Sequence, residues 1–116
     1  MSALIRVKWA VEEMVFLADL YFNSKNRCIE DIDSELQRIS RVLNKRADML
    51  GIEHDEKFRN ISGLKMIIEN IRYVDEQGKN GLGNASAMSY YVVYMRKVDR
   101  THFNEILSEF NSKYGD

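Results

Sequence analysis

The chain contains no proline in 116 residues, and this absence constrains its fold more than any other feature. Proline is the strongest helix breaker because it lacks an amide hydrogen and clashes with the preceding turn. Without proline, glycine marks the breaks between elements, and three of the six glycines lie within residues 78–83. The sequence therefore predicts long helical segments with a glycine-rich connection. Its length suits one domain with a single core.

Apolar residues recur at three- and four-residue steps along five segments, which predicts helices. The five segments are residues 8–23, a stretch from 31–34 to 51, and residues 62–73, 87–98 and 101–113. Residues 90–94 have strand propensity, but the length and flanks of their segment favour a helix. We expect a mainly α fold of four to six short helices. A short hairpin at residues 52–60 or 78–84 is the open alternative.

Polar residues identify where these helices begin. The candidate N-caps are Asp31, Asp33, Ser34, Ser62, Asn84 and Ser86. Gly51 is expected to end the second helix, because glycine readily adopts the left-handed conformation beyond a helix C-terminus. If the second helix is divided into two shorter helices, we expect the division at Asn44.

Composition excludes several functional classes. The single cysteine, Cys28, cannot form an internal disulfide framework, and with two histidines it cannot easily build a structural zinc site. No segment approaches the roughly 20 apolar residues of a membrane span, and no signal peptide is recognised. His54 and Asp55 are adjacent, an arrangement that seldom forms a catalytic pair, and no serine lies in a nucleophile elbow. We expect a cytoplasmic protein that has no enzymatic activity, no cofactor and no membrane partner.

Positive charge is concentrated in the middle of the chain, although the net charge is -1. Residues 38–72 contain eight basic and five acidic side chains, whereas residues 1–37 are net acidic. Nucleic-acid affinity depends on the local placement of lysine and arginine, so a nearly neutral protein can present a basic face. An ordinary solvated helix surface is the alternative interpretation.

The segment Phe58–Lys65 combines polar and basic residues with a helix start. Free backbone N–H groups and the positive end of the helix dipole favour a phosphate at such a position. Arg59 and Lys65 would add charge, and Asn60 could bind a phosphate or a base edge.

A structural interpretation of the same residues is equally open. In it, Ser62 is a helix cap, Asn60 is a turn residue, and Arg59 pairs with Asp55 or Glu56.

A wider pattern includes this segment and extends over most of the chain. Its residues are Trp9, Glu12, Glu13, Leu20, Tyr21, Ser34, Glu35, Leu36, Ser40, Arg41, Val42, Leu43, Arg46, Phe58, Arg59, Asn60, Gly63, Leu64, Lys65, Met66, Asn70, Gly81 and Leu82. On these residues the chain resembles the N-terminal module that precedes HNH nuclease domains in McrA-like, modification-dependent restriction endonucleases and related bacterial defence proteins. It departs from that pattern at Ile61, where the family commonly has proline, and at Ala10, where serine or threonine is usual.

The resemblance implies recognition of double-stranded DNA, in McrA-like proteins DNA with 5-methylcytosine or a related base. It assigns cutting to a separate HNH domain, whose asparagine–histidine metal-binding pattern is absent from this sequence. Residues 1–116 would then be either the targeting domain of a longer restriction or antiphage nuclease or a stand-alone relative. A nuclease domain would be the partner, in cis or in trans.

If DNA is the ligand, the expected contacts fall into three groups. The primary contacts are Arg59, Asn60, Ser62 and Lys65; further phosphate contacts are Arg46, Arg41, Lys45 and Lys57; base-stacking candidates are Tyr73, Tyr90 and Tyr94. The alternative function is a protein-interaction or homo-oligomerisation domain of a bacterial defence system. Its contact surface would be the tyrosine-rich helix 87–98.

Overall fold

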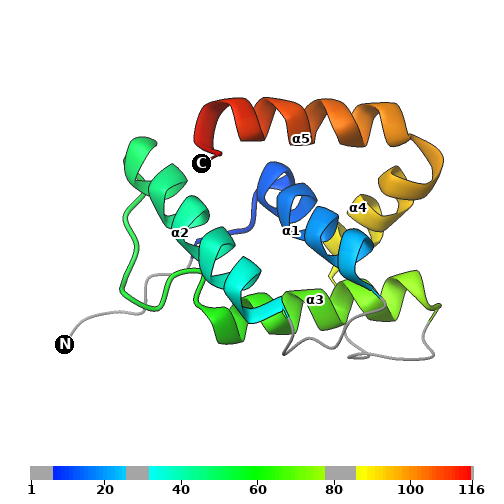
Figure 1. The fold of residues 1–116 in the computed structure, drawn as a ribbon, viewed down its shortest axis with the longest axis horizontal. Helices are drawn as coiled ribbons and strands as arrows, with labels where there is room; N and C mark the ends of the chain where they lie inside the picture. The colour runs from blue at the N-terminus through cyan, green and yellow to red at the C-terminus, as the bar shows by residue number, and fades with distance from the viewer. Residues whose placement is uncertain (1–6, 26–31, 78–85, 116) are drawn as a thin grey trace.

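The computed structural model describes residues 7–25, 32–77 and 86–115, which form five helices and no strand (Figure 1). The helices are α1 (Val11–Ser24), α2 (Asp33–Met49), α3 (Ile61–Asp75), α4 (Ala87–Val98) and α5 (Arg100–Tyr114). This confirms the mainly α expectation. The hairpin considered at residues 52–60 does not form, because these residues make turns that lead into α3. The hairpin considered at 78–84 lies outside the described residues, as do Cys28, Asp31 and Asn84.

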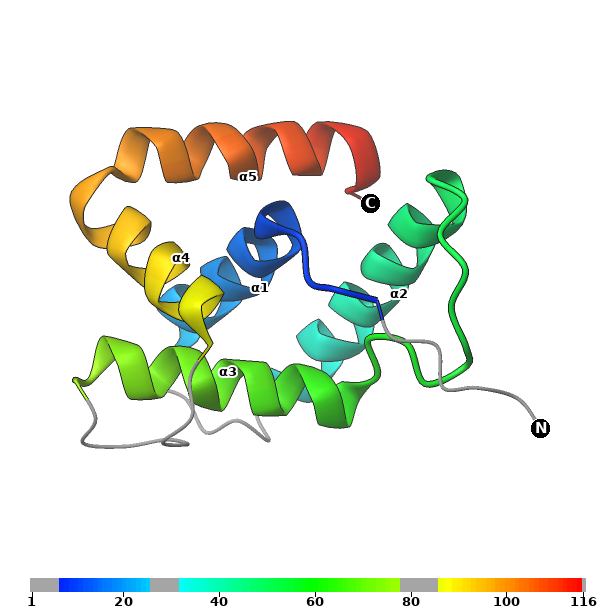
Figure 2. The ribbon, with the colours of Figure 1, turned by 180° about the vertical axis from the view of Figure 1, so that it is seen from behind.

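Helix α1 occupies the centre of the molecule and packs against the other four helices. Residues 13–18 are all buried, so this helix is covered on every side, as expected for a helix that is apolar around most of its circumference. Helix α3 lies along one side of α1 and α5 along the opposite side. Helices α2 and α4 lie at opposite ends of the molecule, as Figures 1 and 2 both show.

Helix α2 continues unbroken past Asn44. The amide of this side chain donates to the carbonyl of Ser40 within the helix (2.8 Å) and to the carbonyl of Phe58 outside it (3.1 Å). The helix ends at Met49, and Gly51, the glycine predicted to terminate it, follows the C-cap Leu50 with a φ of 70°. The amides of Gly51 and Ile52 bond back to the carbonyls of Asp48 and Ala47, which is the Schellman pattern.

Helices α2 and α3 begin where the sequence predicts, but their N-cap residues differ from the predicted ones. Helix α3 is capped by Asn60, whose side chain accepts a bond from the amide of Gly63 (2.9 Å), whereas Ser62 lies exposed in the first turn. Asp33 and Ser34 both lie inside α2, whose N-cap residue is Ile32.

The start of α4 agrees with the sequence prediction. Ser86 caps this helix by accepting from the amide of Ser89 (3.2 Å).

Candidate nucleic-acid interface

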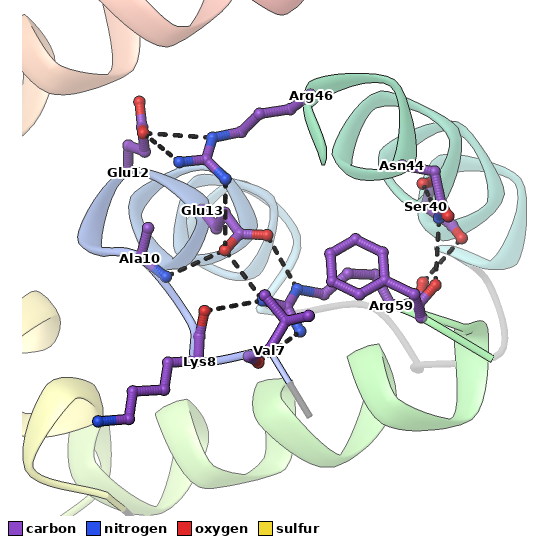
Figure 3. A network of polar contacts seen from close by, with 10 residues as sticks. Val7, Lys8, Ala10, Glu12, Glu13, Ser40, Asn44, Arg46 and Arg59 are labelled. Carbon is purple, nitrogen blue, oxygen red and sulfur yellow. Dashed lines mark hydrogen bonds and ion pairs between the residues drawn. The ribbon is translucent and has the colours of Figure 1, made fainter. Parts of the chain in front are cut away.

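Residues of the sequence pattern that are far apart in the chain meet in one polar network at the start of α1 (Figure 3). Glu13 is its centre and is only 1% exposed. One of its carboxylate oxygens accepts from the amide of Ala10 (3.0 Å), which helps to start α1. The same carboxylate accepts two bonds from Arg59, from Nε at 2.8 Å and from Nη2 at 3.0 Å. This paired geometry is the strongest form of an arginine–carboxylate contact.

The rest of the Arg59 guanidinium is also occupied. It donates to the carbonyls of Val7 (3.3 Å) and Lys8 (3.2 Å), and so holds the segment before α1 in place. Its central carbon lies 4.0 Å from the centre of the Trp9 ring and 4.3 Å from that of Phe58. Arg59 is therefore sandwiched between two aromatic rings, and its side chain is only 7% exposed.

This environment corrects two interpretations of Arg59. It was expected as a primary DNA contact, but its donors are directed into the protein and cannot reach a phosphate. Its acidic partner is Glu13, not Asp55 or Glu56.

Arg46 has a similar structural environment. Its Nε and Nη2 donate to Glu12 (3.2 and 2.5 Å), and its Nη1 lies 3.8 Å from Glu13. Its guanidinium also lies over the ring of Tyr114 at 5.8 Å. Arg46 is buried and joins α2 to α1 and α5, so the expectation that it contacts phosphate is revised as well.

The loop before α3 is held against α2 by side-chain contacts. Arg59 has a φ of 49°, which is unusual for a residue other than glycine, and its carbonyl accepts from the hydroxyl of Ser40 (2.7 Å). The ring of His54 lies 4.6 Å from that of Phe58, and its Nε2 lies 2.8 Å from a carboxylate oxygen of Asp48. The hydrogen bond with Asp48 raises the pKa of His54 above its usual value.

Lys65 pairs with Asp33 at 3.1 Å, which links α3 to α2. Both side chains are partly exposed, and such a surface pair contributes little to stability. Lys65 thus remains near the protein surface, but part of its charge is already neutralised.

The remaining predicted cations lie exposed on α2 and in the loop before α3, which packs against α2. Arg41 and Lys45 are one turn apart on α2, and Lys57 precedes Phe58, the residue bound by Asn44. Within the part of the chain that the structure describes, none of these three cations has an ion-pair partner. We call Arg41, Lys45 and Lys57 the basic seam. The exposed residues Asn60 and Ser62 follow it at the start of α3.

The tyrosines predicted to stack on bases lie elsewhere. Tyr90 and Tyr94 are exposed on α4, and Tyr73 is half-buried on α3. Because α4 and α2 lie at opposite ends of the molecule, Tyr90 and Tyr94 do not form one site with the basic seam (Figures 1 and 2).

A second buried polar cluster was missed by the sequence analysis. Asp75, with a side chain 4% exposed, accepts from the hydroxyl of Tyr21 (2.7 Å) and pairs with Lys25 (2.8 Å) and Lys97 (2.9 Å). Burial alone would raise the pKa of Asp75, but hydrogen bonds from these three partners together outweigh burial and hold it at about 2. Burial and the bond to Asp75 raise the pKa of Tyr21. The cluster ties α1, α3 and α4 together, and no local pattern in the sequence points to it.

Comparisons with protein-family models, with curated proteins and with solved structures found no match to this chain. In the described ranges, no group of three or more histidine, cysteine, aspartate or glutamate side chains is placed to hold a metal ion. The same residues include no helix with the length and apolar character needed to cross a membrane.

Proposed function

We propose that this chain is a DNA-binding targeting module that contacts the phosphate backbone through the basic seam. The observation that carries the proposal is the placement of Arg41, Lys45 and Lys57, which are exposed and without ion-pair partners in the described structure. A lysine or arginine that is already paired with a carboxylate gains less binding free energy from a phosphate contact than an unpaired one does. The basic seam therefore supplies three exposed cations that remain able to bind a polyanion.

Two polar groups beside the basic seam could add contacts. The cap at Asn60 uses the oxygen of its side-chain amide, so the NH₂ group remains available to a phosphate or a base edge. The Ser62 hydroxyl is exposed in the first turn of α3.

Recognition of 5-methylcytosine is the finer form of the proposal, and it rests on the resemblance. Any cutting activity would belong to a separate nuclease domain.

Fluorescence anisotropy with matched duplexes, unmodified and containing 5-methylcytosine, tests both forms. Tighter binding to the modified duplex supports modified-base recognition, whereas equal binding supports phosphate contact alone. The variant Arg41→Gln/Lys45→Gln should weaken binding. The control Arg100→Gln/Lys113→Gln removes the same charge from exposed positions on α5 and should bind as the unmodified chain does. No binding at low salt, or equal losses in the two variants, would contradict the proposal.

A second candidate function is supported by the outer face of α4. Tyr90, Tyr91, Tyr94 and Val98 are large apolar residues that lie exposed there, Tyr94 at 67%. Exposed aromatic residues are characteristic of protein interfaces. If this face mediates assembly, Tyr90→Ser/Tyr94→Ser should shift the oligomeric state in sedimentation without changing DNA affinity. A monomer at all concentrations, with or without these substitutions, would exclude homo-oligomerisation through α4.

A further inference from the structure

A hollow of about 360 Å³ lies between the segment before α1, the middle of α3 and the start of α4. Its walls are mainly apolar and come from Trp9, Met14, Ile67 and Met88. Small-molecule sites are commonly concave, mostly apolar and about this size, with a few polar groups that orient the ligand. The hollow has that composition, and it involves none of the basic-seam residues.

Two polar side chains that line the hollow have no partner in the described part of the chain. Asn70 is half-buried on α3, and its side-chain amide makes no hydrogen bond there. Lys8 is exposed and makes no ion pair there. Arg59 holds the Lys8 carbonyl, while the Lys8 side chain extends away from the polar network towards α4 (Figure 3). An uncommitted amide and an uncommitted ammonium group thus line one apolar cavity.

We propose that this hollow binds a nucleotide-like ligand, namely a planar heteroaromatic ring that carries an anionic group. The Asn70 amide presents a donor beside an acceptor, which is complementary to a ring edge with the same pair of groups. The indole of Trp9 and the thioether of Met88 offer polarizable surfaces to an aromatic ring. The Lys8 ammonium group favours a negatively charged substituent at the cavity edge. The proposal is independent of duplex binding by the basic seam.

Trp9 is the only tryptophan in the chain, so its fluorescence reports directly on this cavity. The titrants are cytidine, adenosine and their 5′-monophosphates, with excitation at the red edge of the indole band, where these bases absorb little. We expect a saturable change with a midpoint of about 0.1–1 mM, as suits a ligand of this size. Each monophosphate should bind more tightly than its nucleoside.

Variants separate the two polar contributions. Asn70→Leu keeps the branched shape and the number of heavy atoms but loses the amide, and it should weaken binding of all four compounds by about tenfold. Lys8→Gln should weaken only the monophosphates. The matched control Asn104→Leu changes an exposed asparagine on α5 and should have no effect.

The same cavity could receive a free nucleotide or a base within a strand, and NMR distinguishes these sources. The side-chain amide resonances of Asn70 should shift with the free monophosphates, with a short single-stranded DNA, or with both, and the responding probe identifies the source. Unshifted resonances and unchanged Trp9 fluorescence with every probe would overturn the proposal, as would a response that Asn70→Leu does not reduce. Arg41→Gln/Lys45→Gln should leave the response unchanged, so failure of duplex binding is distinguished from failure at this cavity.

Discussion

Replacement of Arg59 by methionine should destabilise the fold severely. The substitution keeps an unbranched side chain between Trp9 and Phe58 but removes both bonds to Glu13. Removal of one partner from a buried ion pair typically costs about 3–5 kcal/mol, because the other charge is left uncompensated. Glu13 would keep the amide of Ala10 and the more distant Arg46, so we expect the lower end of that range, about 3 kcal/mol.

Urea unfolding, followed by Trp9 fluorescence and by far-UV circular dichroism, measures this change. A loss of about 3 kcal/mol is a large part of the roughly 5–15 kcal/mol that stabilises a typical domain, and it should lower Tm by about 12 °C. The matched control is Arg41→Met on the exposed face of α2, which should change the free energy of unfolding by less than about 0.5 kcal/mol.

A double-mutant cycle isolates the pair itself. Glu13→Gln and Arg59→Met should each be destabilising, and the double variant should lose about 2 kcal/mol less than the sum of the two, because neither charge is then left alone. If Arg59→Met has the stability of the unmodified chain but loses DNA affinity, Arg59 is a ligand contact and our structural assignment is refuted.

Four further substitutions test the acidic cluster, the histidine pair and the α3 cap by urea unfolding across pH. Because the pKa of Asp75 is lowered in the folded state, its ionised side chain stabilises the fold by about 2 kcal/mol at pH values above the unfolded pKa of 3.8, and this stabilisation is lost as pH falls through about 2. Asp75→Asn should remove this dependence of stability on pH, and an unchanged acid profile would contradict the role of Asp75. Because the pKa of His54 is raised in the folded state, protonated His54 stabilises the fold at pH values below about 6.5, and this stabilisation is lost as pH rises through the folded pKa. His54→Gln should flatten the slope of stability against pH in this range, and an identical slope would exclude the His54–Asp48 pair as its cause. Asn60→Ala should cost about 1 kcal/mol and Ser62→Ala much less, because Asn60 is the cap, and the reverse order would restore Ser62 to that role.

The helices were predictable because their apolar spacing is local information. The bounds predicted for α4, residues 87–98, are those observed, since Ser86 is a strong cap and Asp99 follows the last turn. The start of α3 is harder to predict because Asn60 and Ser62 are both competent caps. The turn in which the Asn60 amide bonds to the Lys57 carbonyl places Asn60 at the cap, and this geometry is not visible in the sequence.

The candidate site was harder to predict because an arginine in a sequence does not reveal whether it is buried. Arg59 and Arg41 look alike as letters, yet Arg59 finds Glu13 46 residues away and Arg41 finds no ion-pair partner among the described residues. Similarly, Asp75 meets Tyr21 across 54 residues, a contact that only helix packing creates. Local charge density drew attention to residues 38–72, but it could not separate the buried cations of the scaffold from the exposed cations without ion-pair partners.

The salt dependence of duplex binding tests the central proposal most directly. Each phosphate contact contributes about 0.9 to the slope of log affinity against log salt concentration, so three basic-seam cations predict a slope of about -2 to -3. The variant Arg41→Gln/Lys45→Gln should reduce the magnitude of this slope by about 2, whereas Arg100→Gln/Lys113→Gln should leave it unchanged. A slope that Arg41→Gln/Lys45→Gln does not reduce, or no binding even at low salt, would contradict the assignment of the basic seam as the DNA-binding surface.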